Sequence, residues 1–191
     1  MTLHAAVAEL VDHLREQAHE LSVLSTIVAQ DAPPERSSFV DRLQEDIEAS
    51  RGLAAEALAA AQAALDASSY PPDAPSSRRN LTAAHRALAQ LGRSLSTEVG
   101  SSRHMDELRR LAATPAEGWA GWASVVRDTI ERCLRQLHGV NDDLVLACEE
   151  AIDPELLSVA VSVRMPHGSV DHEMFAPGEL TRQPGRSEDL S

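Results

Sequence analysis

An apolar rhythm with steps of three and four residues recurs in four long segments of this chain. Side chains spaced in this way fall on one face of an α-helix, which has 3.6 residues per turn. The first stripe comprises Leu3, Val7, Leu10, Leu14, Gln17, Leu21, Leu24 and Val28. The later stripes run from Val40 to Ala61, from Leu81 to Leu95 and from Trp119 to Ala147. Four long amphipathic helices must bury these faces against one another.

We therefore predict an all-α protein: an elongated antiparallel four-helix bundle with long helices. The 191 residues are the size of one domain, and we place the bundle at 1–152. Prolines and turn-forming residues separate the predicted helices, and Thr114 with Pro115 and Glu117 has the capping pattern of a helix start. Gly100-Ser101-Ser102 interrupts the third stripe, so we expect a kink at 100–102. The predicted helices cover about 2–30, 38–68, 77–112 and 115–152.

The apolar period changes to two after Asp153-Pro154. Four apolar side chains alternate there with smaller or polar residues, namely Val159, Val161, Val163 and Met165. This alternation within a 153–165 linker is typical of a β-strand, and the alternative is an extended tail. A single strand has no partner in this chain, so we predict that these residues bind a partner protein or a second copy. Residues 166–191 are rich in Pro, Gly and charge and predict a disordered acidic tail.

Charge and composition exclude several function classes. A net charge of -13 repels phosphate and anionic lipid, so we expect neither nucleic-acid nor membrane binding. All seventeen basic residues are arginines, which excludes lysine-dependent chemistry. No segment has the pattern of a signal peptide or a membrane span, so we expect a cytoplasmic protein. Cys133 and Cys148 lie about 22 Å apart on one predicted helix, too far for a disulfide, and we predict buried thiols.

The segment Glu16-Gln17-Ala18-His19 matches the Glu-x-x-His element with which some four-helix bundles hold two metal ions. Such a centre also needs a second Glu-x-x-His element and two further inward glutamates. The sequence has no second element. We therefore predict no metal site and no cofactor, and we interpret His13, Glu16, His19 and Glu20 as a solvated polar face.

Arg79, Asn80 and His85 form an Arg-polar-x4-His pattern. This pattern resembles the motif of the HEPN-family helical-bundle endoribonucleases. The resemblance implies that Arg79 holds the scissile phosphate, that His85 acts in acid–base chemistry, that Asn80 supports them, and that a second chain completes the site. In the alternative interpretation, Arg79 lies near a helix start and His85 lies on a polar face.

A second short pattern, Trp119-Ala120-Gly121, resembles the Trp-x-Gly turn of small helical-hairpin proteins exported by type VII secretion. No Tyr-x-x-x-Asp/Glu signal follows the last predicted helix, because the only tyrosine is Tyr70. In the alternative interpretation, Trp119 and Trp122 share one helix face and close one end of the bundle.

Two classes of function follow from these patterns. The first is a non-enzymatic interaction or accessory protein, a scaffold or adaptor that acts through contacts with another protein or with itself. The second is a HEPN-like dimeric endoribonuclease that uses Arg79 and His85. Catalysis needs several titratable groups directed at one point, and plain amphipathic helices do not predict such convergence, so the sequence favours the first class.

Overall fold

The computed structural model describes residues 2–33, 38–69, 73–114 and 118–150, and its regular structure there is helical throughout. The elements are α1 (Leu3–Gln30), α2 (Ser38–Ala67), α3 (Ala74–Arg93), the π-helix η1 (Ser94–Val99), α4 (Ser102–Ala112) and α5 (Trp119–Glu150). The prediction of an all-α protein is confirmed for these ranges. The predicted strand with Val159, Val161, Val163 and Met165, and the predicted tail at 166–191, lie outside the described residues.

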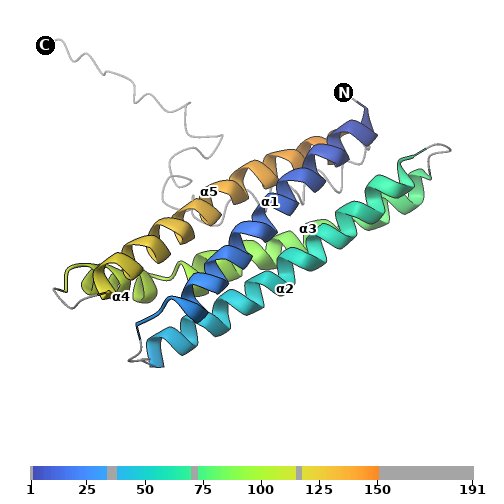
Figure 1. Cartoon of the computed structure of the whole chain (residues 1–191). Helices are drawn as coiled ribbons and strands as arrows, with labels where there is room; N and C mark the ends of the chain where they lie inside the picture. Colours follow the sequence, from blue (N-terminus) through green and yellow to red (C-terminus); the bar gives the residue numbers. More distant parts are fainter. Residues whose placement is uncertain (1, 34–37, 70–72, 115–117, 151–191) are drawn as a thin grey trace, which may run out of the picture.

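The long helices lie side by side in an elongated body, with α4 at one end (Figure 1). α2 contacts both α1 and α3, and α5 contacts both α1 and α4. At the start of α1, His4 Nδ1 lies 3.0 Å from the Ser68 hydroxyl, just after the end of α2. Near the end of α1, the carbonyl oxygen of Ile27 accepts a hydrogen bond of 3.3 Å from Trp122 Nε1, near the start of α5. The first turn of α1 is therefore beside the end of α2, and its last turn is beside the start of α5.

The predicted stripes form the hydrophobic core. The largest fully buried side chains are Leu10, Leu14, Leu21, Leu24, Leu43, Ile47, Leu81, Leu88, Leu91, Leu95, Leu108 and Ile130. α2 adds four fully buried alanines, Ala54, Ala57, Ala61 and Ala64, whose short side chains allow neighbouring helices to pack closely. Cys133 and Cys148 are buried thiols that form no disulfide, as predicted. Burial raises the pKa of Cys133 to about 12, so this thiol stays protonated at neutral pH.

The predicted third helix, 77–112, is divided into α3, η1 and α4. α3 starts at Ala74, earlier than predicted, because the Asp73 carboxylate accepts a hydrogen bond from the Ser76 N–H at 3.2 Å and caps the helix. Pro75 lies in the first turn, where its missing N–H costs nothing, although the predicted helix began only at 77. The break between η1 and α4 falls at Gly100 and Ser101, within the interval 100–102 where a kink was expected.

The last predicted helix, about 115–152, corresponds to α5, which begins at Trp119, and residues 115–117 lie outside the described ranges. Gly118 has a φ of 88°, which is outside the right-handed helical region, so α5 does not extend through it. Thr114 follows the end of α4 and is bonded to its last turn: its N–H donates to the carbonyl of Leu111 at 3.1 Å, and its hydroxyl donates to the carbonyl of Arg110 at 2.9 Å. Its side chain is therefore engaged with the preceding helix.

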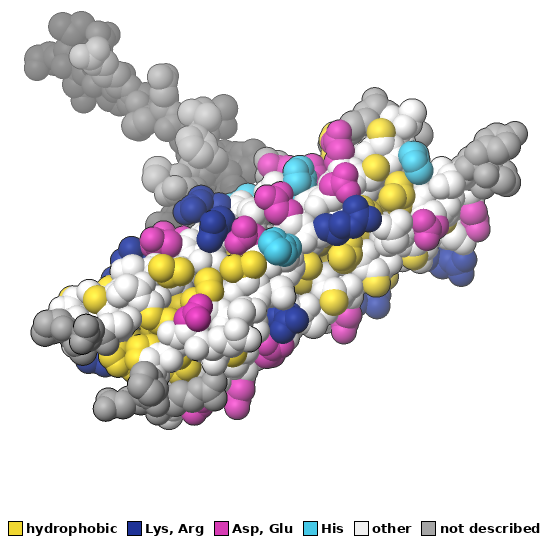
Figure 2. Space-filling view, viewed as in Figure 1, with side chains coloured by type: hydrophobic (Ala, Val, Ile, Leu, Met, Phe, Trp, Pro, Cys, Tyr) yellow, Lys and Arg dark blue, Asp and Glu magenta, His cyan; other side chains and the backbone are white. Residues whose placement is uncertain are grey.

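Charged and apolar side chains are distributed unevenly over the surface. Figure 2 shows arginines, acidic residues and histidines interspersed along one face, with hydrophobic side chains gathered at the end where α1 ends and α5 begins. Among the described helices, none combines the length and apolar character that crossing a bilayer requires.

Candidate interaction surface

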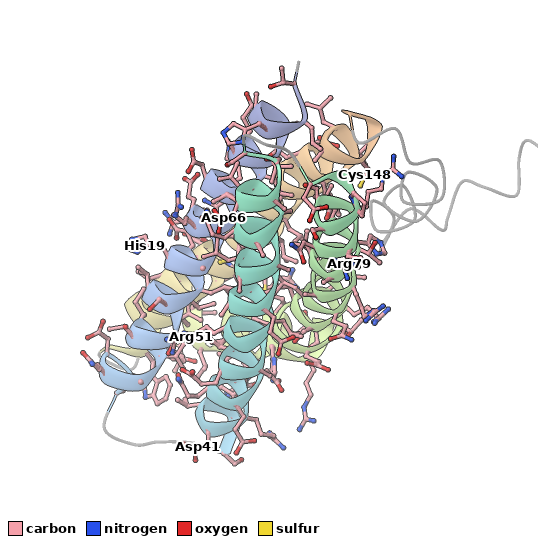
Figure 3. All side chains as sticks on the ribbon, turned by 90° about the vertical axis from the view of Figure 1, so that its right-hand side faces the viewer. His19, Asp41, Arg51, Asp66, Arg79 and Cys148 are labelled. Carbon is pink, nitrogen blue, oxygen red and sulfur yellow. The ribbon has the colours of Figure 1, made fainter. Side chains whose placement is uncertain are left out.

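The residues of the HEPN-like pattern lie on different faces of α3. Arg79 is exposed on the outer side of α3 in Figure 3, and its guanidinium donates to the Ser76 hydroxyl at 2.9 Å. His85 is only 9% exposed, and Asn80 is half-buried. Six residues of α-helix correspond to about 9 Å of rise and about 120° of rotation. Within one chain, Arg79 and His85 therefore do not converge, and their catalytic role stays a prediction.

The predicted polar face of α1 carries contacts to α5. Glu16 and His19 are exposed, whereas His13 pairs with the Asp143 carboxylate and Glu20 forms an ion pair with Arg132, whose Nε lies 3.2 Å from the carboxylate. The hydrogen bond that the protonated ring donates to the Asp143 carboxylate raises the pKa of His13. In the described ranges, no group of three His, Cys, Asp or Glu side chains is placed to hold a metal ion. The two pairs join α1 to α5.

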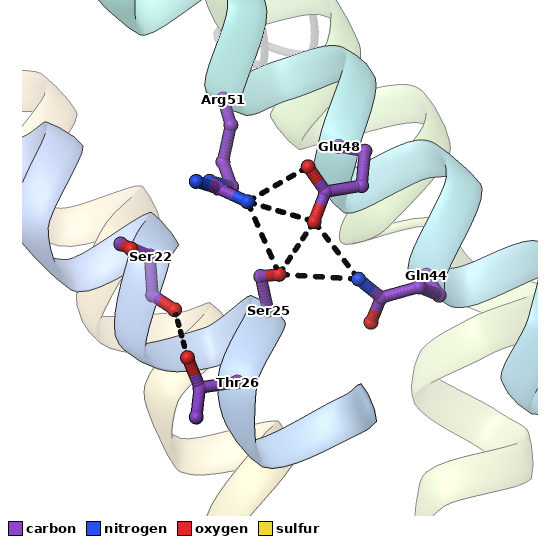
Figure 4. Close-up of polar contacts among 6 residues, drawn as sticks. All are labelled: Ser22, Ser25, Thr26, Gln44, Glu48 and Arg51. Atoms are coloured by element: carbon purple, nitrogen blue, oxygen red, sulfur yellow. Dashed lines mark hydrogen bonds and ion pairs between the residues drawn. The ribbon is translucent and has the colours of Figure 1, made fainter. Parts of the chain in front are cut away.

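A polar network joins α1 to α2 (Figure 4). The Ser25 hydroxyl donates to Glu48 at 2.5 Å, and Arg51 Nη1 donates to both Glu48 oxygens at 2.9 and 2.8 Å. Gln44 Nε2 donates to Ser25 and Glu48 at 3.1 and 2.9 Å. The Ser25 hydroxyl and the Arg51 guanidinium lower the pKa of Glu48. A groove of about 420 Å³ adjoins this network, but the charged groups beside it already satisfy one another.

A second polar cluster surrounds η1. The only sign of it in the sequence was the interruption of the third apolar stripe near 100–102. The Ser94 hydroxyl donates to Glu98 at 2.7 Å and lies 2.8 Å from the Ser50 hydroxyl. His104 Nδ1 lies 2.8 Å from the Glu98 carbonyl oxygen, and its Nε2 lies 3.7 Å from the Asp46 carboxylate. π-Helices are frequent at functional sites, but here both histidine nitrogens face other groups and neither activates a serine. The cluster joins α2, η1 and α4.

The open apolar site lies at the junction of α1 and α5. The rings of Trp119 and Trp122 pack edge to face with centroids 5.4 Å apart, and Trp122 is 6% exposed. A groove of about 250 Å³ is lined there by Ile27, Asp31, Gly118, Gly121, Trp122 and Val125, which we call the terminal groove. Val125 is 50% exposed and is the one large hydrophobic side chain that is exposed in the described ranges.

The terminal groove also has a negative edge. Asp31 is the C-cap residue of α1, and the last turn of this helix contains no basic residue. The carbonyl end of a helix carries partial negative charge, which cationic side chains in the last turn of many helices offset. Here a carboxylate is added to that negative end. The groove therefore combines an apolar wall with a negative rim.

Comparison with known proteins identifies no relative: no protein-family model, no curated protein and no solved structure matches the chain. The interpretation of the terminal groove therefore depends on its own residues and their chemistry.

Proposed function

We propose that the chain is an antiparallel four-helix bundle that acts as a non-enzymatic interaction or accessory protein. It binds a protein partner or a second copy of itself, and the terminal groove is its contact surface. The half-exposed Val125 beside Trp122 is the observation that carries this proposal. Scattered exposed apolar atoms are normal, but a large aliphatic side chain on the rim of a tryptophan-lined groove is typical of binding surfaces.

The polar groups elsewhere support the same class of function. The hydroxyl and carboxylate groups of the Ser25 network and of the η1 cluster are hydrogen-bonded to one another. An enzyme site needs several such groups directed at a common open point. The helix contacts support the bundle, because the first and last turns of α1 meet the end of α2 and the start of α5.

The proposal is tested by the substitution Val125→Arg, which places a charged side chain in the terminal groove. The matched control is Ala59→Arg, at an exposed position of α2 that lines none of the grooves described above. We expect Val125→Arg to abolish self-association in sedimentation experiments or capture of a partner by the tagged chain, and Ala59→Arg to preserve it. Equal association of both variants with the wild type would contradict the proposal.

Val159, Val161, Val163 and Met165 are proposed as a second contact with the partner, because their period-two pattern predicts an unpaired strand. Truncation after Asp153 removes all four. We expect a nearly unchanged melting temperature together with weaker association. Unfolding on truncation would instead indicate that the segment packs on the helices, and unchanged association would indicate that it is only a tail.

The alternative, a HEPN-like endoribonuclease, is distinguished by cleavage assays with single-stranded RNA and tRNA. We expect any cleavage by the purified protein to be indifferent to Arg79→Ala and His85→Ala. Loss of cleavage in both variants, with their helical circular dichroism unchanged, would favour the enzyme over the interaction protein.

A further inference from the structure

The geometry points to a partner of specific chemistry: we infer that the terminal groove binds a basic amphipathic segment, in which an Arg or Lys side chain lies next to an apolar one. This inference rests on the proposed function and names the class of partner that the same surface takes. It follows from the juxtaposition of Val125 and Trp122 with the carboxylate of Asp31 at the end of α1.

The apolar part of the groove is sized for side chains of a partner. Its volume of about 250 Å³ is below the range of about 300–1,000 Å³ that is typical of small-molecule pockets. Gly121 leaves space on the α5 side, because a Cβ atom added there meets nothing within 4 Å. A partner aliphatic side chain placed here would cover Val125 and contact the part of Trp122 that lines the groove.

The charged part of the groove favours a cation. α1 presents the negative end of its dipole at Asp31, and this last turn has no basic side chain of its own. Arg127 follows Val125 by two residues, but its guanidinium pairs with Asp128 at 2.8 Å and approaches Glu131 at 3.9 Å. The net charge of -13 adds long-range attraction for a basic segment and repels an acidic one.

The intrinsic tryptophan fluorescence of the chain reports binding at this site. Trp122 lines the terminal groove, Trp119 packs against it, and the chain has no other tryptophan, so a change in tryptophan emission reports occupancy of this end. The probe is a short amphipathic peptide of Leu, Ala and Arg, titrated into the full chain. The matched probe has every Arg replaced by Glu. We expect a saturable emission change with the basic peptide, at an affinity at least about ten-fold tighter than with the acidic one.

Two variants separate the apolar and the charged contributions. Asp31→Asn should reduce the preference for the basic peptide to less than about three-fold, whereas Asp66→Asn, an exposed carboxylate at the far end of α2, should preserve it. Val125→Ser should weaken both peptides without adding charge. Circular dichroism of each variant shows whether the helices are retained.

The outcomes distinguish this inference from the proposed function. Equal binding of the two peptides, with loss in Val125→Ser, would overturn the basic partner while the terminal groove remains a contact surface. Tryptophan emission that changes with protein concentration alone, without peptide, would identify a second copy as the occupant and would also overturn the basic partner. If Val125→Ser changed neither peptide binding nor association, both the basic partner and the proposed contact surface would be refuted.

Discussion

Replacing Gln17 with Met should stabilise the protein. Gln17 lies in the apolar stripe of α1 and is fully buried. Neither its amide nitrogen nor its amide oxygen has a hydrogen-bond partner among the described residues. It lies between His13 and Glu20, whose contacts with Asp143 and Arg132 join α1 to α5. The amide is therefore held in the interior by packing rather than by polar contacts.

The magnitude follows from the cost of burying an unpaired polar group, about 1–3 kcal/mol. Met matches Gln in side-chain length and fills the site without a cavity. We expect Gln17→Met to raise the free energy of unfolding by about 2 kcal/mol. For a domain of this size that corresponds to a rise in melting temperature of roughly 4–8 °C.

Urea denaturation followed by circular dichroism measures this difference, and calorimetry gives the melting temperature. Gln90→Met is the matched control, because Gln90 is exposed on α3 and the same chemical change there should alter stability by less than about 0.5 kcal/mol. A loss of more than about 1 kcal/mol in Gln17→Met would refute the reasoning, because it would show that the amide makes a buried hydrogen bond, for example to an internal water.

Two further predictions concern the contacts of α1 with α5 and the end of η1. Asp143 raises the pKa of His13 above 6.5, so the pair stabilises the fold below that value, and this contribution disappears as the pH rises through the folded-state pKa. The melting temperature of the wild type should therefore exceed that of His13→Asn at acidic pH, and the difference should vanish at alkaline pH. A difference that grows with pH would contradict this prediction. Gly100→Ala should destabilise the folded protein by about 1–3 kcal/mol, because the added Cβ would meet the Leu95 carbonyl oxygen at 2.7 Å. Gly139→Ala, with open space around the added Cβ, should not destabilise it, and the two variants are compared by their midpoints of urea denaturation.

The helical class was predictable because apolar periodicity is a property of long segments. Most of each stripe is buried in the structure, including the polar Gln17 and Ser50 that the rhythm placed within it. The ends of the helices were less predictable. Thr114 has the chemistry of an N-cap, and only the structure shows its hydroxyl bonded to the preceding turn. The positive φ of Gly118 and the start of α3 before Pro75 likewise depend on how the chain turns between packed helices.

The terminal groove was predictable in part. The sequence placed Trp119 and Trp122 on one helix face, and their rings do pack against each other. Val125 carried a usable signal, since it lies beside Val126 of the stripe and therefore points away from the core side of α5. The contribution of Asp31 was not predictable, because it requires the end of α1 to lie beside the start of α5, and that pairing is a property of the tertiary fold.

Photo-cross-linking from position 125 tests most directly whether the chain works through protein contacts at this end. A photoreactive amino acid replaces Val125 in one sample and the exposed Ala59 of α2 in another, and both are irradiated in the cells that produce the protein. We predict one dominant covalent adduct from position 125, either a second copy or a distinct protein with a basic amphipathic segment, and none from position 59. The same adducts from both positions, or no adduct from position 125 in a folded chain, would contradict the proposed function.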